Sequence, residues 1–276
     1  MSNKLIKIVD MSTVKHDMKI IGILGGIPHH SGLEYFRQIN DKVQKSLPWK
    51  YAGNTSKILM CCVNFEEQLS YLVANRMDMA CNLLCEAACR LHRGGADFLV
   101  IASNTGHIAI PRIEQVLPHF PYLHIADCCA VKCLERNVKN VALMGTRYTM
   151  QQNFIKDRLK LHGLNIFTPP ESFFDEMERI IEREVASGKF IASSKKWMIE
   201  EIIRKELIKK QGAEACIFGC TDIGLLVKAS DVPEVFIVDS LQVHIDAIVD
   251  VQLGKKSILE FLPGIKVGPI KQKPKL

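Results

Sequence analysis

The sequence has no long hydrophobic run, few aromatic residues and no recognisable nucleotide-binding motif. No stretch of about 18 consecutive apolar residues occurs, so we expect no transmembrane helix and no membrane partner. Aromatic side chains make up only 7% of the 276 residues, and without an aromatic-studded basic face we expect no nucleic-acid partner. The Gly-rich turn at residues 25–32 matches neither G-x-G-x-x-G nor a P-loop. The composition, with 47% hydrophobic and 24% charged residues, is typical of a globular protein.

The ten cysteines include no Cys-x-x-Cys pair and no accompanying histidine set, so we expect no metal site. The first residues also lack the apolar core of a secretory signal. We therefore expect reduced cysteines and a cytoplasmic protein. Cys81, Cys85 and Cys89 recur every four residues, which favours packing along one face of a helix.

The two ends of the chain differ from its middle. Residues 1–17 are mixed and polar, and residues 264–276 form a basic tail without acids that adds to the net charge of +6. We interpret both as extensions outside the fold. The last residues, Pro274-Lys275-Leu276, loosely resemble a peroxisomal Ser-Lys-Leu signal, but proline in place of serine favours the cytoplasm.

The most informative stretch is residues 215–224, ACIFGCTDIG, which begins apolar and then becomes small and polar. This pattern is typical of a buried parallel strand that ends at a turn before a helix. Cys220 and Thr221 then lie at the carboxyl end of the strand, where open α/β sheets bind ligands. A helix N-terminus there favours an anion or a thiolate, so Cys220 is either a catalytic acid/base or a packed thiol.

Strands alternate with helices along the chain. Apolar runs predict strands at residues 19–24, 58–63, 98–102 and 122–126, and helices at 33–47 and 78–93. Ser31 precedes the first helix and could cap it. Polar residues follow several strands, among them Asn64 and Ser103-Asn104-Thr105. The alternation predicts an α/β fold with mostly parallel sheets flanked by helices.

The pattern then starts again about 115 residues later. Gly25, Ser103 and Asp127 have counterparts in Gly145, Cys220 and Asp239, at offsets of 145 − 25 = 120, 220 − 103 = 117 and 239 − 127 = 112. These matches predict two similar lobes with an active site in the cleft between them. We expect lobe 1 to comprise residues 18–126 plus 240–263, and lobe 2 residues 127–239.

Such a cleft would place Ser103 and Cys220 on opposite walls. Two groups that face each other across a small substrate can remove a proton from one face of a carbon and return one to the other face, which is racemisation. A thiolate suits this role, whereas a serine hydroxyl carries protons poorly. Asn104, Thr105 and Thr221 could hold a substrate carboxylate or simply cap helices.

These motifs resemble those of the cofactor-independent aspartate/glutamate racemases. Residues 21–40, IGILGGIPHHSGLEYFRQIN, are similar to the opening of that family, and residues 103–107, SNTGH, are similar to its first catalytic turn, usually Cys-Asn-Thr-x-His. Residues 145–150, GTRYTM, and 219–224, GCTDIG, are similar to turns of its second lobe. The resemblance implies racemisation of aspartate or glutamate without a cofactor, catalysed by Cys220 and Ser103, and a homodimer.

The sequence departs from the family in two places. Ser103 stands where the family has its first catalytic cysteine, and in this respect the chain resembles a branch that acts on L-aspartate and L-glutamate and has a hydroxyl residue there. The opening loop, which holds substrate in the family, reads Ile27-Pro28-His29-His30-Ser31 instead of Met-Ser-Trp-Glu-Ser. A related decarboxylase or isomerase, or a non-catalytic binder of small carboxylates, remains an alternative.

The resemblance and the strand-end positions together give the predicted site. Cys220 and Ser103 are the expected catalytic pair. Substrate binding is expected from Asn104, Thr105, Thr221, Asn64, Ile27 and Ser31. We expect His29, His30 and His107 to be loop or supporting histidines, and Asp222 to be an acid in the first turn of a helix.

Overall fold

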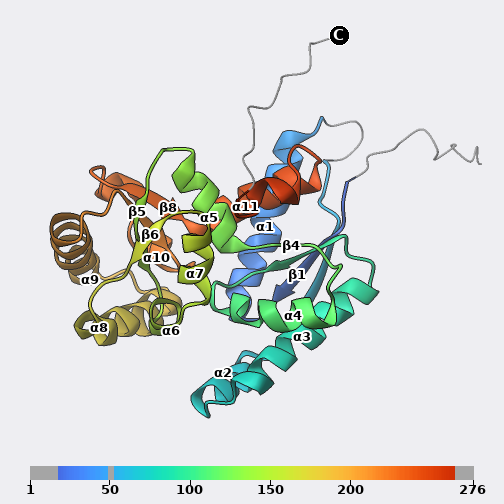
Figure 1. The fold of residues 1–276 in the computed structure, drawn as a ribbon, viewed down its shortest axis with the longest axis horizontal. Coiled ribbons are helices and arrows are strands. Elements are labelled where there is room, and N and C mark those ends of the chain that lie inside the picture. The colour runs from blue at the N-terminus through green and yellow to red at the C-terminus, as the bar shows by residue number, and fades with distance from the viewer. Residues whose placement is uncertain (1–17, 49–52, 265–276) are drawn as a thin grey trace, which may run out of the picture.

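Two parallel four-stranded sheets form the frame of the computed structural model (Figure 1), which describes residues 18–48 and 53–264. The first sheet has the order β2-β1-β3-β4 and the second β6-β5-β7-β8. The strands of the first are β1 (Ile21–Gly25), β2 (Ile58–Cys62), β3 (Phe98–Ile101) and β4 (Tyr122–Leu123). Those of the second are β5 (Asn140–Met144), β6 (Asn165–Phe167), β7 (Ala215–Phe218) and β8 (Phe236–Asp239). The shared order confirms the predicted α/β fold with two similar lobes.

The central strands are apolar because both faces of each sheet are covered. Every residue of β1, β3 and β7 is buried, as expected of parallel strands between two layers of helices. β1 pairs with β2 and β3, and β5 pairs with β6 and β7. The carboxyl ends of β3 and β7 therefore occupy equivalent places in the two lobes.

Helices flank both sheets, and none in residues 18–48 and 53–264 combines the length and apolar character needed to cross a membrane. The first lobe carries α1 (His29–Ser46), α2 (Phe65–Val73), α3 (Met77–Arg93) and α4 (Ile110–Val116). The second carries α6 (Arg147–Gln151), α7 (Phe154–Leu161), α8 (Phe174–Arg179), α9 (Ala192–Trp197) and α10 (Ile223–Leu226). A π-helical segment, η6 (Met198–Lys210), continues α9, and short helical segments include η2 (Thr105–Ala109) and η8 (Ile258–Phe261).

Two helices connect the lobes near the middle of Figure 1. α5 (Ile125–Leu134) follows β4 but buries Ile125 and Cys129 in a core shared with β5 and β7. α11 (Ser240–Gln252) follows β8 but buries Ile245 and Ile248 in a core shared with β1 and α1. The two helices also pack against each other. Each lobe thus receives a helix from the chain that leaves the other, while the lobe boundaries at residues 126 and 240 stay predictions.

Three local expectations are corrected by the structure. The predicted strand at 122–126 ends at Leu123, because the His124 Nδ1 atom accepts a hydrogen bond from Ala126 N and caps α5. α1 begins at His29 instead of residue 33, after extended backbone at Pro28. Ser31 therefore lies inside the first turn of α1 and does not cap it. Residues 1–17 and 265–276, which include the expected extension and nearly all of the basic tail, lie outside the described residues.

Candidate active site

The turns that follow β3, β5 and β7 come together through Thr149, a buried residue of α6. Its Oγ1 lies 3.4 Å from Thr105 Oγ1, two residues after Ser103. Its Cγ2 would lie 3.2 Å from a Cβ atom placed on Gly219, the residue before Cys220. The hydroxyls of Ser31 and Thr221 lie 3.1 Å apart and form a second link between the lobes. The structure thus gathers Ser31, Thr105 and Thr221 around one junction.

Cys220 lies at this junction and is half-buried. Burial raises the pKa of its thiol to about 12, with a further contribution from the nearby Asp222 carboxylate. The backbone N–H groups of Asp222 and Ile223 lower the pKa but do not offset burial. The N–H groups at the start of the short helix α10 thus favour the thiolate, as expected from the sequence, but burial has the larger effect on the pKa.

Ser103 is held tightly by its own turn and is only 8% exposed. Its Oγ accepts a hydrogen bond from Gly106 N at 3.4 Å. Its backbone carbonyl accepts a hydrogen bond from His107 Nδ1 at 2.8 Å. His107 Nε2 accepts from Ile125 N at 3.2 Å, which fixes the proton on Nδ1. His107 therefore positions the backbone of Ser103 from behind.

Asn104 joins the same turn to the point where the chain returns to the first lobe. Its Nδ2 donates to Ser240 Oγ at 3.0 Å, and Ser240 Oγ donates to Phe218 O at 2.6 Å. Phe218 is the last residue of β7. This chain of hydrogen bonds fixes the ends of β3 and β7 relative to each other.

Thr221 and Asp222 form a polar group beside the first turn of α1. Burial raises the pKa of the Asp222 carboxyl, whereas the hydrogen bond with Thr221 and the proximity of His30 lower it. Asp222 occupies the N-cap position of α10 without a side-chain capping bond. The expectation of an acid in the first turn is therefore wrong by one residue, because Asp222 lies just before α10 and the first turn of that helix contains no acid.

Ile27 packs directly on the Ser103 turn, since a Cβ atom on Gly106 would lie 3.2 Å from Ile27 Cδ1. Gly26 allows the loop this course: its φ is +89°, and a Cβ atom there would collide with the backbone of Val63. Asn64, which follows Val63 in the sequence, is exposed. Its Oδ1 caps α2 by accepting a hydrogen bond from Glu67 N at 3.2 Å. Ile27 is therefore at the junction, and Asn64 lies at the neighbouring strand end.

A buried cluster of histidines supports the Ser103 turn, and its extent was not predicted from the sequence. The rings of His107 and His124 lie 4.4 Å apart, and those of His107 and His244 lie 6.0 Å apart. His244 Nε2 donates to Leu123 O at 3.0 Å, so its Nδ1 accepts from Tyr35 Oη at 2.8 Å. Burial lowers the pKa of His107 to about 4 and that of His244 to about 3, and lowers that of His124 well below its usual value.

Thr149, Ser240 and His244 are the residues at or behind the site that were not predicted. The similarity of residues 145–150 to a racemase turn was a signal for Thr149, but it did not single out one hydroxyl. Ser240 lies 136 residues from its partner Asn104 in sequence, and His244 lies 209 residues from its partner Tyr35. Only the fold brings them together. Within residues 18–48 and 53–264, no three His, Cys, Asp or Glu side chains are grouped to hold a metal ion.

The two sheets of the same strand order and their paired strand-end turns define a two-lobed α/β protein. The chain belongs to the Asp/Glu/hydantoin racemase family, whose model matches residues 24–248. It is similar to a putative Asp/Glu racemase from Yersinia pestis, with 34% identity, a TM-score of 0.78, and coverage of 86% of this chain and 100% of that one. An aspartate racemase homologue from Pyrococcus horikoshii is 29% identical with a TM-score of 0.72, covering 85% and 99% of the two chains.

A third relative is a broad-specificity amino-acid racemase of Bacillus subtilis, 24% identical over 161 residues. The match covers 57% of this chain and 65% of that protein, so it spans slightly less than two thirds of the length of the curated relative.

Proposed function

We propose that this protein is a cofactor-independent racemase of a small acidic amino acid such as aspartate or glutamate. The observation that carries the proposal is the equivalent placement of Ser103 and Cys220 after β3 and β7, in two lobes joined through Thr149. Membership of a family named for Asp/Glu racemases supports the same reaction.

In the proposed reaction Cys220 acts on one face of Cα and Ser103 on the other. The Cys220 thiolate takes the α-proton, the electron pair of the broken C–H bond passes into the substrate carboxylate, and a proton returns from the Ser103 side. Because the pKa of the free thiol is raised to about 12, Cys220 is protonated before substrate binds. A substrate ammonium group nearby would favour the thiolate and lower this pKa. In the reverse direction the thiol donates its proton to the carbanion.

The substrate carboxylate would be held by hydroxyl and amide groups at the junction. Thr105, Thr221 and Ser31 offer hydroxyls there, and the second Nδ2 hydrogen of Asn104 is not used by its bond to Ser240. Ile27 would close the apolar side of the site against the Ser103 turn. Asn64 is proposed as a contact for the outer end of the substrate, and binding would then compete with its capping of α2.

A non-catalytic binder of small carboxylates is the second candidate, and the observation that favours it is the chemistry of the pair itself. The hydroxyl of Ser103 carries protons poorly, and burial raises the pKa of the Cys220 thiol to about 12. Exchange of the α-proton with solvent separates the two candidates, because a binder catalyses none.

The testing experiment is a panel of both enantiomers of the common amino acids, incubated in deuterium oxide and scored for deuterium at Cα. Exchange with aspartate or glutamate that Cys220→Ala abolishes would support the racemase. Cys89→Ala is the matched control, since Cys89 is a partly buried thiol on α3, away from the junction. Failure of every acidic amino acid to exchange would refute the proposal.

A homodimer and a cytoplasmic location are also proposed. The homodimer rests on family resemblance alone, and light scattering of the purified chain tests it. The location is tested by imaging a tagged chain with and without its last three residues, which lie outside the described part of the structure.

A further inference from the structure

A cavity of about 740 Å³ adjoins the site described above. It extends from Ser31 and Thr221, the hydroxyl pair that links the lobes, to α10 and the start of α11. Its volume falls within the range of small-molecule sites, roughly 300–1,000 Å³. Because the cavity meets the proposed racemase site, its charged side chains bear directly on what that site binds.

Three carboxylates line this cavity, and two of them already have partners. Glu34 pairs with Arg37 at 2.6 Å. Asp239 accepts hydrogen bonds from two backbone N–H groups at the start of α11, at 3.0 and 3.3 Å. Asp222 is different: in residues 18–48 and 53–264, no Lys, Arg or His nitrogen lies within 4.0 Å of its carboxylate.

The cations nearest to Asp222 do not form an ion pair with it. Lys228 lines the same cavity, but its Nζ donates a hydrogen bond to Gly224 O. His30 on α1 is exposed and close enough to lower the pKa of the Asp222 carboxyl, without reaching pairing distance. The Asp222 carboxylate therefore faces the cavity with an unmatched charge.

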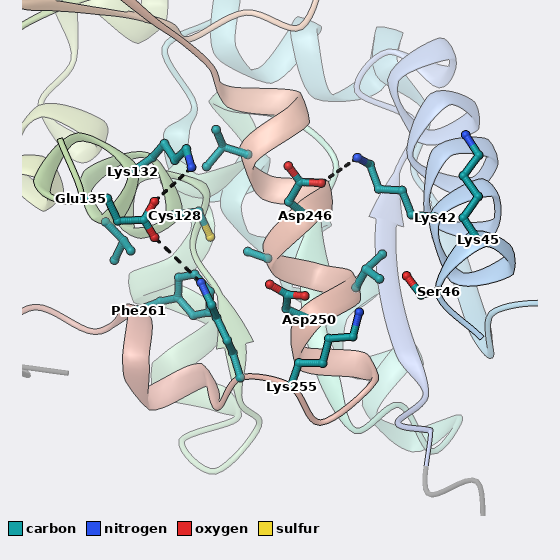
Figure 2. Close-up of a pocket in the computed structure, with 15 residues that line it drawn as sticks. Lys42, Lys45, Ser46, Cys128, Lys132, Glu135, Asp246, Asp250, Lys255 and Phe261 are labelled. Atoms are coloured by element: carbon teal, nitrogen blue, oxygen red, sulfur yellow. Dashed lines mark hydrogen bonds and ion pairs between the residues drawn. The ribbon is translucent and has the colours of Figure 1, made fainter. Parts of the chain in front are cut away.

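Two carboxylates of another cavity show the usual arrangement. In that cavity, of about 440 Å³ between α1, α5 and α11, Asp246 lies 2.6 Å from Lys42 and Glu135 lies 3.0 Å from Lys132 (Figure 2). Asp222 has instead lost part of its water without gaining a cation, and burial raises the pKa of its carboxyl. A cationic group of a ligand would supply the missing partner.

The position of Asp222 indicates which ligand group this is. Cys220, Thr221 and Asp222 are consecutive in the turn between β7 and α10, and the backbone N–H of Asp222 approaches the Cys220 thiol. One turn thus offers a thiol, a hydroxyl and a carboxylate, whereas an α-amino acid presents a proton, a carboxylate and an ammonium group on one carbon. Given the racemase function proposed above, we propose that Asp222 binds the α-ammonium group of the substrate while Ser31 and Thr221 hold its carboxylate.

This contact would also couple substrate binding to the thiol. In the free protein the Asp222 carboxylate adds to the effect of burial in raising the pKa of Cys220, and Glu182 makes a smaller contribution. An ammonium group on Asp222 cancels its negative charge, so the thiol ionises more easily once an amino acid is bound. A dicarboxylate without an amino group leaves that charge in place.

Isothermal titration calorimetry of the full chain with two matched pairs of acids tests the proposal. The pairs are aspartate with succinate and glutamate with glutarate, in which the second acid lacks the amino group. The parent should bind at least one amino acid more tightly than its counterpart. Asp222→Asn should weaken that amino acid about tenfold or more, because a charge-assisted contact is lost, and should not weaken the counterpart. Asp157→Asn, in an exposed acid of α7, is the matched control and should change neither affinity.

Alkylation of Cys220 by iodoacetamide in the ligand-free protein gives a second readout, followed by mass spectrometry of the peptide. Asp222→Asn should raise the rate a few-fold between about pH 7 and 9, because the carboxylate no longer opposes ionisation of the thiol. Asp222→Glu keeps the charge and should keep the parental rate. A purely structural role of Asp222 would not separate these two variants by charge.

Each other outcome overturns the proposal or a defined part of it. Equal weakening of an amino acid and its counterpart by Asp222→Asn would refute the ammonium contact, as would parental affinity for both. A chain that binds none of the four acids would refute it too. An unchanged alkylation rate in Asp222→Asn would refute the coupling to Cys220. Failure of the racemase function appears separately, as absence of deuterium exchange while the preference for the amino acid persists.

Discussion

The hydroxyl oxygens of Thr105 and Thr149 lie 3.4 Å apart across the two lobes, and Thr149 Oγ1 also lies 3.2 Å from Thr146 Oγ1. Thr105 follows Ser103 by two residues, and the methyl group of Thr149 packs beside Gly219, which precedes Cys220. One buried threonine therefore fixes the distance between the two proposed catalytic turns.

Removal of the Thr149 hydroxyl should impair catalysis more than folding. Thr149→Val keeps the shape of the side chain but leaves the Thr105 hydroxyl without this partner, so kcat/KM should fall about tenfold or more as the turns lose their fixed separation. Thr149→Ser, which keeps the hydroxyl, is the control and should retain most of the activity. Steady-state racemisation of the parent and the two variants measures the effect, and equal activity in all three would contradict it.

Loss of the Cys220 thiol should abolish turnover. Cys220→Ala removes the group that transfers the proton on one face of Cα, so exchange and racemisation should fall at least about 10²-fold, the lower range for general acid–base catalysis. The melting temperature should change little, because the side chain is only half-buried. The control variant Cys89→Ala should keep the parental activity. If Cys220→Ala also stays within a few-fold of the parent, Cys220 has no part in the mechanism.

The raised pKa of Cys220 should also appear in the pH profile of one enantiomer. With a free-protein pKa of about 12, the thiolate fraction grows tenfold per pH unit. For the enantiomer that presents its α-proton to Cys220, kcat/KM should therefore rise about tenfold per unit between about pH 6 and 8.5. The other enantiomer needs Cys220 as a thiol and should show no such rise. A plateau at neutral pH for both enantiomers would mean that the free thiol is already ionised.

The sequence allowed the prediction of both lobes but not of the contacts between them. Apolar strands and the repeated turns around Gly25, Ser103 and Cys220 follow from local patterns, which determine where a buried strand ends. The Thr105–Thr149 contact and the bond from Asn104 to Ser240 join segments 44 and 136 residues apart. No local pattern encodes such a pairing.

The raised pKa of the Cys220 thiol could not be predicted from the sequence, because it too depends on packing in the folded protein. Its place after β7 suggested a helix N-terminus that favours a thiolate, but the balance between backbone N–H groups and burial depends on how the thiol packs against the core of the second lobe. Burial is the larger effect. The strand expected at 122–126 failed because a histidine, His124, serves as the helix cap, and histidine is not among the residues usually preferred there.

The buried histidines should make the protein less stable in acid. The pKa of His107 is lowered from 6.5 to about 4 and that of His244 to about 3. A lowered folded-state pKa gives stability that is present above the unfolded pKa near 6.5 and is lost as the pH falls towards the folded values. The free energy of unfolding should therefore fall below about pH 6.5, by up to about 1.4 kcal/mol per pH unit for each histidine.

Urea unfolding between pH 5 and 7 measures this slope. Glutamine can still donate and accept hydrogen bonds but does not titrate. His107→Gln should therefore remove the contribution of one histidine to the pH dependence of the free energy of unfolding. The exposed His119 provides the control, since His119→Gln should leave the slope unchanged. A slope that is the same in the parent and in His107→Gln would show that His107 does not stay neutral in the folded protein.

Ser103 should make the two enantiomers behave unequally. The Cys220 thiolate can take the α-proton that faces it, whereas the serine hydroxyl is a poor base from the opposite face and is already held by Gly106 N. One enantiomer should thus exchange its α-proton readily, and its mirror image much more slowly. Ser103→Cys should raise racemisation and make the enantiomers more alike, whereas Ser103→Ala should reduce inversion and spare exchange on the Cys220 side. Deuterium incorporation and optical rotation, followed together for each enantiomer, separate exchange from inversion. If Ser103→Ala inverts its substrate at the parental rate, the second proton carrier is another group, and a water molecule becomes the candidate, because the His107 nitrogens are already engaged with Ser103 O and Ile125 N.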